Sequence, residues 1–162
     1  MIIFFLLVLF VTQGVMAQTI TRVYGYRTVT IPGNIPVVPP ENGKGEPVVH
    51  DHAESYYIFV ESNTGKAPVV KSVRINGALF RVLVQQQATP VVYEYFDGAE
   101  ERRITLVPGK GKRVFSIILS GIFAGTRGKT GANELTVNYM NNGKMKMAVL
   151  KKIADLPVSV TQ

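Results

Sequence analysis

Short runs of alternating apolar and polar residues follow one another from residue 55 to near the C-terminus. This alternation is typical of β-strands that bury one face. Phe80, Val82 and Val84 line one side of such a run, whereas residues 56–60 are apolar on both sides, as expected of a central strand. No segment combines an apolar stripe of helical period with helix caps. The pattern therefore predicts an all-β domain of about eight strands without a significant helix.

Turn signals separate several of these runs. Asn76-Gly77 favours a type I′ turn, because both central residues of that turn need a positive φ, and Asp97-Gly98 and Asn142-Gly143 give further signals. Around the last of these turns two rows of alternate residues are apolar: Leu135, Val137 and Tyr139 before it, and Met145, Met147 and Val149 after it. We expect both rows to face the core and the residues between them to face solvent.

Alternating strands hide their apolar face against a second layer. The expected fold is therefore an antiparallel two-sheet β-sandwich, with a barrel as the alternative. The layout over about residues 50–155 is similar to that of immunoglobulin- and fibronectin-type sandwiches, although the chain has no Cys and no Trp to form their central pin. This resemblance implies an architecture and carries no function with it.

Residues 1–17 have the pattern of a cleaved signal peptide. Residues 2–11 form an unbroken apolar run, and Val15 and Ala17 make a small-residue cleavage site. As a helix this run would span only about 15 Å, half of a bilayer core, which leaves a retained anchor as the weaker alternative. Export without any Cys favours a bacterial envelope protein that is periplasmic, outer-membrane-associated or extracellular.

The rest of the chain divides into three parts. Residues 18–31 are rich in Thr, Val and Tyr and form either an N-terminal strand or an interaction arm. Their apolar side changes face around Gly25, which predicts a bulge or a break there. Residues 32–54 are rich in Pro and Gly and predict a loop or linker, because proline has no N–H for a ladder. Residues 55–162 form the predicted sandwich domain.

Metal-capable residues are concentrated in one segment, but no motif predicts catalysis. His50, His52 and Glu54 share one side of an extended chain at spacings of about 7 Å, and such a set suits a divalent ion such as zinc. The alternative is a polar loop that leads into the next strand. The chain has no Gly-x-Ser-x-Gly elbow, and Phe123 stands where a phosphate-binding loop needs its first glycine. We therefore expect no enzyme activity and no cofactor.

The basic residues are concentrated in the C-terminal part. The formal net charge is +7, and residues 101–162 hold eleven of the 18 Lys and Arg residues but three of the 11 acidic residues. Many of them fall in or beside predicted turns, and turns at one end of a sandwich lie close together. We expect a basic rim that binds an anionic partner, with lysines that only block edge pairing as the alternative. The candidate residues are Lys110, Lys112, Arg113, Arg127, Lys129, Lys144 and Lys146.

These features predict a non-catalytic structural or protein-interaction module whose partner is an envelope protein or an anionic glycan. Nucleic acid is disfavoured as a partner, because the chain is expected to be exported and has no evident stacking platform. Contact with a membrane would be by association only, and the oligomeric state stays open. A carbohydrate- or cell-wall-binding module with tyrosines as its platform is the first alternative. A metal-binding protein that uses His50, His52 and Glu54 is the second.

Overall fold

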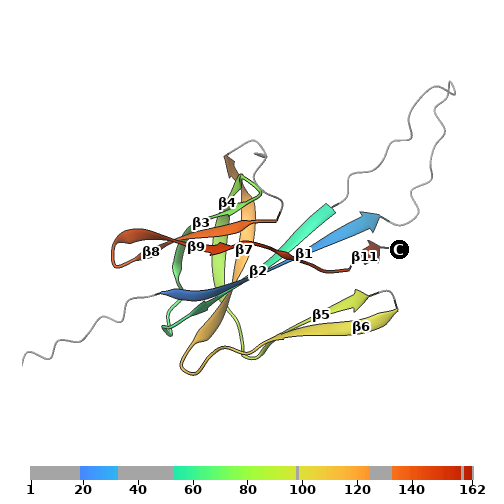
Figure 1. Cartoon of the computed structure of the whole chain (residues 1–162), viewed down its shortest axis with the longest axis horizontal. Helices are drawn as coiled ribbons and strands as arrows, with labels where there is room; N and C mark the ends of the chain where they lie inside the picture. Colours follow the sequence, from blue (N-terminus) through green and yellow to red (C-terminus); the bar gives the residue numbers. More distant parts are fainter. Residues whose placement is uncertain (1–18, 33–52, 98, 125–132, 158, 162) are drawn as a thin grey trace, which may run out of the picture.

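A computed structural model describes residues 19–32, 53–97, 99–124, 133–157 and 159–161 (Figure 1). These ranges contain eleven β-strands and no helix, so the all-β prediction is confirmed. The strands are β1 (Ile20–Pro32), β2 (Ala53–Ser62), β3 (Val69–Ile75), β4 (Ala78–Gln86), β5 (Val91–Asp97), β6 (Glu100–Leu106), β7 (Arg113–Ala124), β8 (Leu135–Asn141), β9 (Lys144–Leu150), β10 (Ala154–Asp155) and β11 (Ser159–Thr161).

Nine of the strands form one curled, mixed sheet with the order β10-β1-β2-β7-β4-β3-β8-β9, in which β11 also pairs with β1. Strands β10 and β11 run parallel to β1, and the other pairs are antiparallel. The predicted pair of separate antiparallel sheets is not confirmed. The reason lies in hairpin β3–β4, which pairs only from Val73–Phe80 to Ile75–Ala78, so that one sheet folds over on itself at this corner.

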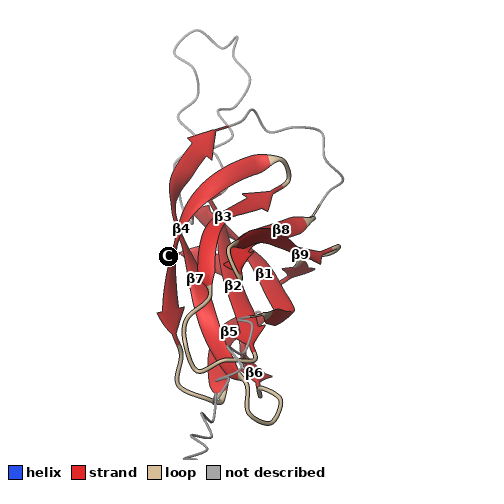
Figure 2. Cartoon of the chain, turned by 90° about the vertical axis from the view of Figure 1, so that its left-hand side faces the viewer, coloured by secondary structure: helices blue, strands red, loops and turns tan. Residues whose placement is uncertain are grey.

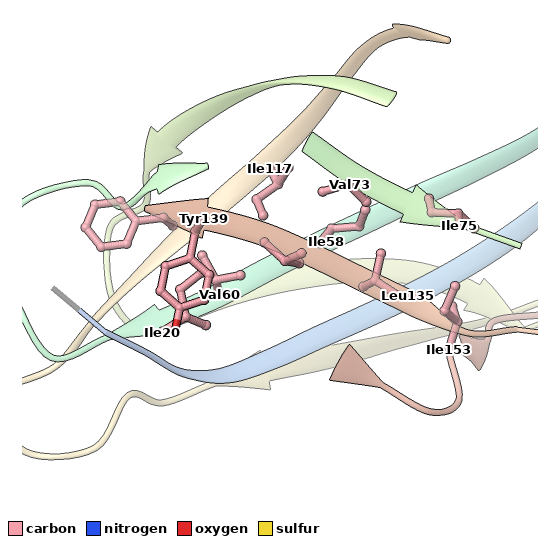
Figure 3. Close-up of a cluster of buried hydrophobic side chains, with 11 residues drawn as sticks. Ile20, Ile58, Val60, Val73, Ile75, Ile117, Leu135, Tyr139 and Ile153 are labelled. Carbon is pink, nitrogen blue, oxygen red and sulfur yellow. The ribbon is translucent and has the colours of Figure 1, made fainter. Parts of the chain in front are cut away.

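The main core lies inside the fold of this sheet (Figure 3). Ile58, Val60 and Ile117 from β2 and β7 lie on one side of the core, and Val73 and Leu135 from β3 and β8 lie on the other. The remaining buried members of the cluster are Ile20, Ile75, Phe115, Val137, Tyr139 and Ile153. Burial of large apolar side chains on this scale is the main force that holds the curled sheet together.

The two-stranded sheet β5–β6 covers part of the outer side of the main sheet (Figure 1). A second buried cluster lies between these layers and comprises Phe59, Val91, Leu106 and Val114. Tyr57 of β2 and Tyr93 of β5 meet there with their ring centres 4.3 Å apart. Strands β1, β2 and β7 therefore contribute to a core on both of their faces.

Strand β1 pairs with β2 without interruption through Gly25, so the predicted bulge or break at this residue is wrong. The register shift falls between Ile20 and Arg22 instead. The apolar side changes along β1 because Val23 packs into the main core, whereas Tyr24 and Tyr26 pack beneath hairpin β5–β6.

Gly25 itself is required by a close approach. A Cβ atom at this position would lie 2.9 Å from Cδ2 of Leu150 and 3.1 Å from Cδ2 of Leu135. The bare backbone of β1 therefore lets the end of β9 pack against it.

Hairpin β8–β9 turns through Asn142 and Gly143, with φ of 49° and 72°. The turn pairs Asn141 with Lys144, and the register then sets Tyr139 opposite Lys146 and Leu135 opposite Leu150. Directly paired residues point to the same face of a sheet. The expectation that Met145, Met147 and Val149 face the core is therefore wrong, because Lys146, Ala148 and Leu150 share the inner face with the buried row of β8.

Candidate functional site

Four chain segments meet at one end of the curled sheet, which Figure 2 views from outside. Asn141 beside the β8–β9 turn donates a hydrogen bond from Nδ2 to Oγ1 of Thr19, at 3.2 Å. The main-chain N–H of Thr19 donates in turn to Oδ1 of Asn63 after β2, at 2.9 Å. Ser62 at the end of β2 pairs with Arg113 at the start of β7. These contacts join the turns that carry several of the predicted basic residues.

We call this region the basic end, and define it by Lys66, Lys71, Lys110, Lys112, Arg113, Lys144 and Lys146. The fold thus brings together five of the seven residues predicted from the sequence. Lys66 and Lys71 were missed, because they lie far from the C-terminal part in sequence and join it only through the pairing of β3 with β8. Lys66 lies in the segment that links two predicted strands, and Lys71 lies just after it. Their position beside a predicted connection is the sequence signal that could have found them.

Arg127 and Lys129 lie outside the described residues. The residues that flank this segment, Ala124 and Asn133, belong to the opposite end of the sheet. Ala124 pairs with Leu79 near the start of β4, and the carbonyl of Asn133 accepts a hydrogen bond from the N–H of Ile153. The place of Arg127 and Lys129 in the basic rim therefore stays a prediction.

The acidic residue at the basic end is Glu61, whose side chain is only 4% exposed. Lys112 Nζ and Thr21 Oγ1 each donate to its Oε1 at 2.8 Å, and the N–H of Gly109 donates to its Oε2 at 3.2 Å. Burial by itself would raise the pKa of Glu61, but these hydrogen bonds outweigh it and hold the pKa below its ordinary value.

Lys112 has a structural role that Lys110, Arg113 and Lys144 do not share, because it forms an ion pair with Glu61. It ties the β6–β7 loop to β1 and β2, and its charge is compensated within the protein. By contrast, no described carboxylate forms an ion pair with Lys110, Arg113 or Lys144. These side chains are exposed, so their positive charges act on the surrounding solvent.

At the opposite end, Glu54 belongs to a polar cluster. Its Oε2 accepts a hydrogen bond from the Tyr56 hydroxyl at 2.6 Å, and its Oε1 lies 3.7 Å from Arg27. Arg27 also binds Asp155 at 2.7 Å. Burial, followed by the bond to Glu54, raises the pKa of Tyr56 to about 12. The Glu54 carboxylate is thus already occupied by partners within the protein.

The other two predicted metal ligands, His50 and His52, lie outside the described residues. Within the ranges given above, no three His, Cys, Asp or Glu side chains are grouped so that they could hold a metal ion. The zinc hypothesis therefore stays a prediction.

The tyrosines considered as a glycan platform lie mostly between layers. Tyr24, Tyr26 and Tyr57 pack against the buried cluster beneath hairpin β5–β6 and are only partly exposed. Burial raises the pKa of the Tyr26 hydroxyl, and burial together with the bond to Tyr57 raises that of Tyr93. The Arg22 guanidinium lies 5.9 Å from the ring centre of Tyr24. These tyrosines therefore do not form an open flat row.

Comparison of this chain with protein-family models, with curated proteins and with solved structures finds no match. None of the described segments forms a helix that is long and apolar enough to cross a membrane.

Proposed function

We propose that this chain is an exported, non-catalytic protein-interaction module of a bacterial envelope, whose basic end binds an acidic partner. The observation that carries the proposal is the gathering of seven Lys and Arg residues from three stretches of the chain, residues 66–71, 110–113 and 144–146, at one end of the sheet. The one described acid among them, Glu61, is buried and bound to Lys112. The exposed charges of Lys110, Arg113 and Lys144 attract an anionic surface and speed its encounter with this end.

A sandwich architecture is part of this proposal. It is supported by hairpin β5–β6, which lies on the main sheet as the second layer of a sandwich would. The wider likeness to immunoglobulin-type domains stays a prediction. Location in the periplasm, at the outer membrane or outside the cell rests on the leader pattern of residues 1–17. Mass spectrometry of the protein purified from its native envelope tests this part, because cleavage after Ala17 leaves Gln18 as the first residue.

Two double variants test the basic end. Lys110→Glu with Arg113→Glu reverses charge at the basic end, and Lys151→Glu with Lys152→Glu makes the same change in net charge beyond β9, at the opposite end. The measurement is elution from immobilised poly-glutamate in a salt gradient. We expect the unchanged protein and the Lys151/Lys152 variant to elute late and the Lys110/Arg113 variant to elute early, since exposed charges act over about 10 Å at 0.1 M salt.

Equal shifts for the two variants would mean that net charge, and not a localised surface, causes retention. No retention of the unchanged protein at low salt would remove the proposal altogether. Retention on an anionic polysaccharide but not on poly-glutamate would favour the glycan-binding alternative. Far-UV circular dichroism of each variant checks that the fold is intact.

A further inference from the structure

We propose that strand β9 accepts an extended segment of the partner as an added strand, and that this segment alternates acidic and apolar residues. The inference rests on the proposed function, because it names how an acidic protein partner would dock at the basic end. It starts from the place of β9 in the sheet. Strand β9 is the last strand in the sheet order, and within the described residues it pairs with β8 alone.

The turn before β9 determines which main-chain groups are available. In a type I′ turn the N–H of Lys144 points back toward Asn141 and hence toward β8. Hydrogen-bonded and non-hydrogen-bonded pairs then alternate along an antiparallel ladder. The main-chain N–H and C=O groups of Met145, Met147 and Val149 therefore point away from β8. Such a row of groups, which no described strand pairs with, is a template for another strand.

The side chains of β9 are unusually accessible for a strand of this sheet. Met145, Met147 and Val149 are 56%, 69% and 51% exposed on the outer face. Lys144 and Lys146 point to the inner face but are exposed as well. Toward the far end of the strand, Ala148 and Leu150 are partly buried against the main core, and Leu150 packs on Gly25. The accessible part is therefore residues 144–147, next to the basic end.

The two faces of this segment define the chemistry of its partner. A residue that pairs with Met145 or Met147 would lie on the outer face, where an apolar side chain gains contact with flexible thioethers. A residue beside Lys144 or Lys146 would lie on the other face, where a carboxylate gains an opposite charge. An alternating acidic and apolar strand satisfies both faces at once. Pairing with β9 of a second copy would bring four lysines into one ribbon, which charge repulsion opposes.

Binding of two synthetic peptides to the full protein tests the inference. One peptide alternates Glu and Val over eight residues, and the other has the same composition in two blocks. We expect the alternating peptide to bind about tenfold more tightly by isothermal titration calorimetry, because only it can present both faces to β9. Met147→Pro removes one free N–H and should weaken its binding about tenfold. Met147→Thr keeps that N–H and should weaken it less.

A third peptide avoids any effect of a variant on folding. It is the alternating peptide with methyl groups on the main-chain nitrogens of every second residue. It is prepared in two forms, one methylated at the odd-numbered and one at the even-numbered residues. We expect one register to lose binding and the other to keep it, because an added strand bonds along one edge only.

The outcomes separate the two proposals. Equal binding of the alternating, block and methylated peptides would overturn strand addition but keep an acidic partner at the basic end. No binding of any peptide, together with no retention on poly-glutamate, would overturn both. Self-association that Met147→Pro abolishes in sedimentation velocity would identify a second copy as the occupant and overturn the acidic partner.

Discussion

The wall formed by β1, β2 and β7 and the hairpin β8–β9 belong to the same curled sheet but differ in how their outer faces are covered. Hairpin β5–β6 lies over the wall, so Val114 on its outer side has no exposed surface. Met147 on the outer side of β9 is 69% exposed. Both segments carry apolar side chains on their outer face, so the difference in exposure comes from the presence or absence of a covering layer.

The largest effect should come from placing a charge on each of these faces. Val114→Asp would bury an unpaired carboxylate beneath hairpin β5–β6 and should lower the free energy of unfolding by at least about 3 kcal/mol. Met147→Asp, the matched change on the open face, should alter it by less than about 0.5 kcal/mol. Thermal unfolding followed by circular dichroism measures both. Similar losses for the two variants would contradict the contrast between the covered and the open face.

The features of the fold that were predicted correctly are local ones. The positive φ at Asn76, Gly77, Asn142 and Gly143 follows from residue types that tolerate it, and the turns stand where the sequence places them. The exposed face of β9 was mispredicted, because alternation shows which residues share a face but not which face finds cover. Which face of β9 is buried depends on its register with β8 and on which part of the sheet hairpin β5–β6 covers, and the second of these involves a distant part of the chain.

The candidate site was predicted only in part for the same reason. Lys110, Lys144 and their neighbours could be expected at turns, and strand order then brought Lys66 and Lys71 to them. No local pattern indicates that Glu61, in a run that reads as a buried strand, would bind Lys112. Pairing between residues 51 positions apart requires the full topology.

The second-largest effect on stability should come from the contact between β1 in the wall and β9 in hairpin β8–β9. Gly25→Val would drive side-chain atoms against Leu150 and Leu135 and should cost about 1–3 kcal/mol, because the crowded core must shift to admit them. Gly65→Val is the control, since the nearest atom to a Cβ there is the Arg113 side chain at 3.7 Å. Urea unfolding of the two variants gives the comparison. A stable Gly25→Val protein would show that β9 can move away from β1 at little cost.

The buried carboxylate of Glu61 should make the free energy of unfolding depend on pH. Glu61→Gln removes the charged partner of Lys112 and should cost about 1–3 kcal/mol at pH 7. Because the folded state lowers the pKa of Glu61, its contribution is complete above its ordinary value of 4.5 and is lost as pH falls through the lower folded value. The difference between the two proteins should therefore shrink below about pH 4. A difference that stays constant from pH 7 to pH 3 would assign the loss to shape instead of charge.

The smallest effect belongs to an exposed carboxylate at the other end. Asp155 binds Arg27 at 2.7 Å and helps hold β10 beside β1, but its side chain is half exposed. Asp155→Asn should therefore cost only about 0.2–1 kcal/mol, and 1 M salt should remove most of that cost by screening. Urea unfolding at low and high salt, in parallel with Glu61→Gln, makes the test. Because the Glu61 carboxylate is buried, the loss of stability in Glu61→Gln should persist at 1 M salt. Equal salt sensitivity of the two variants would contradict the distinction between covered and open charges.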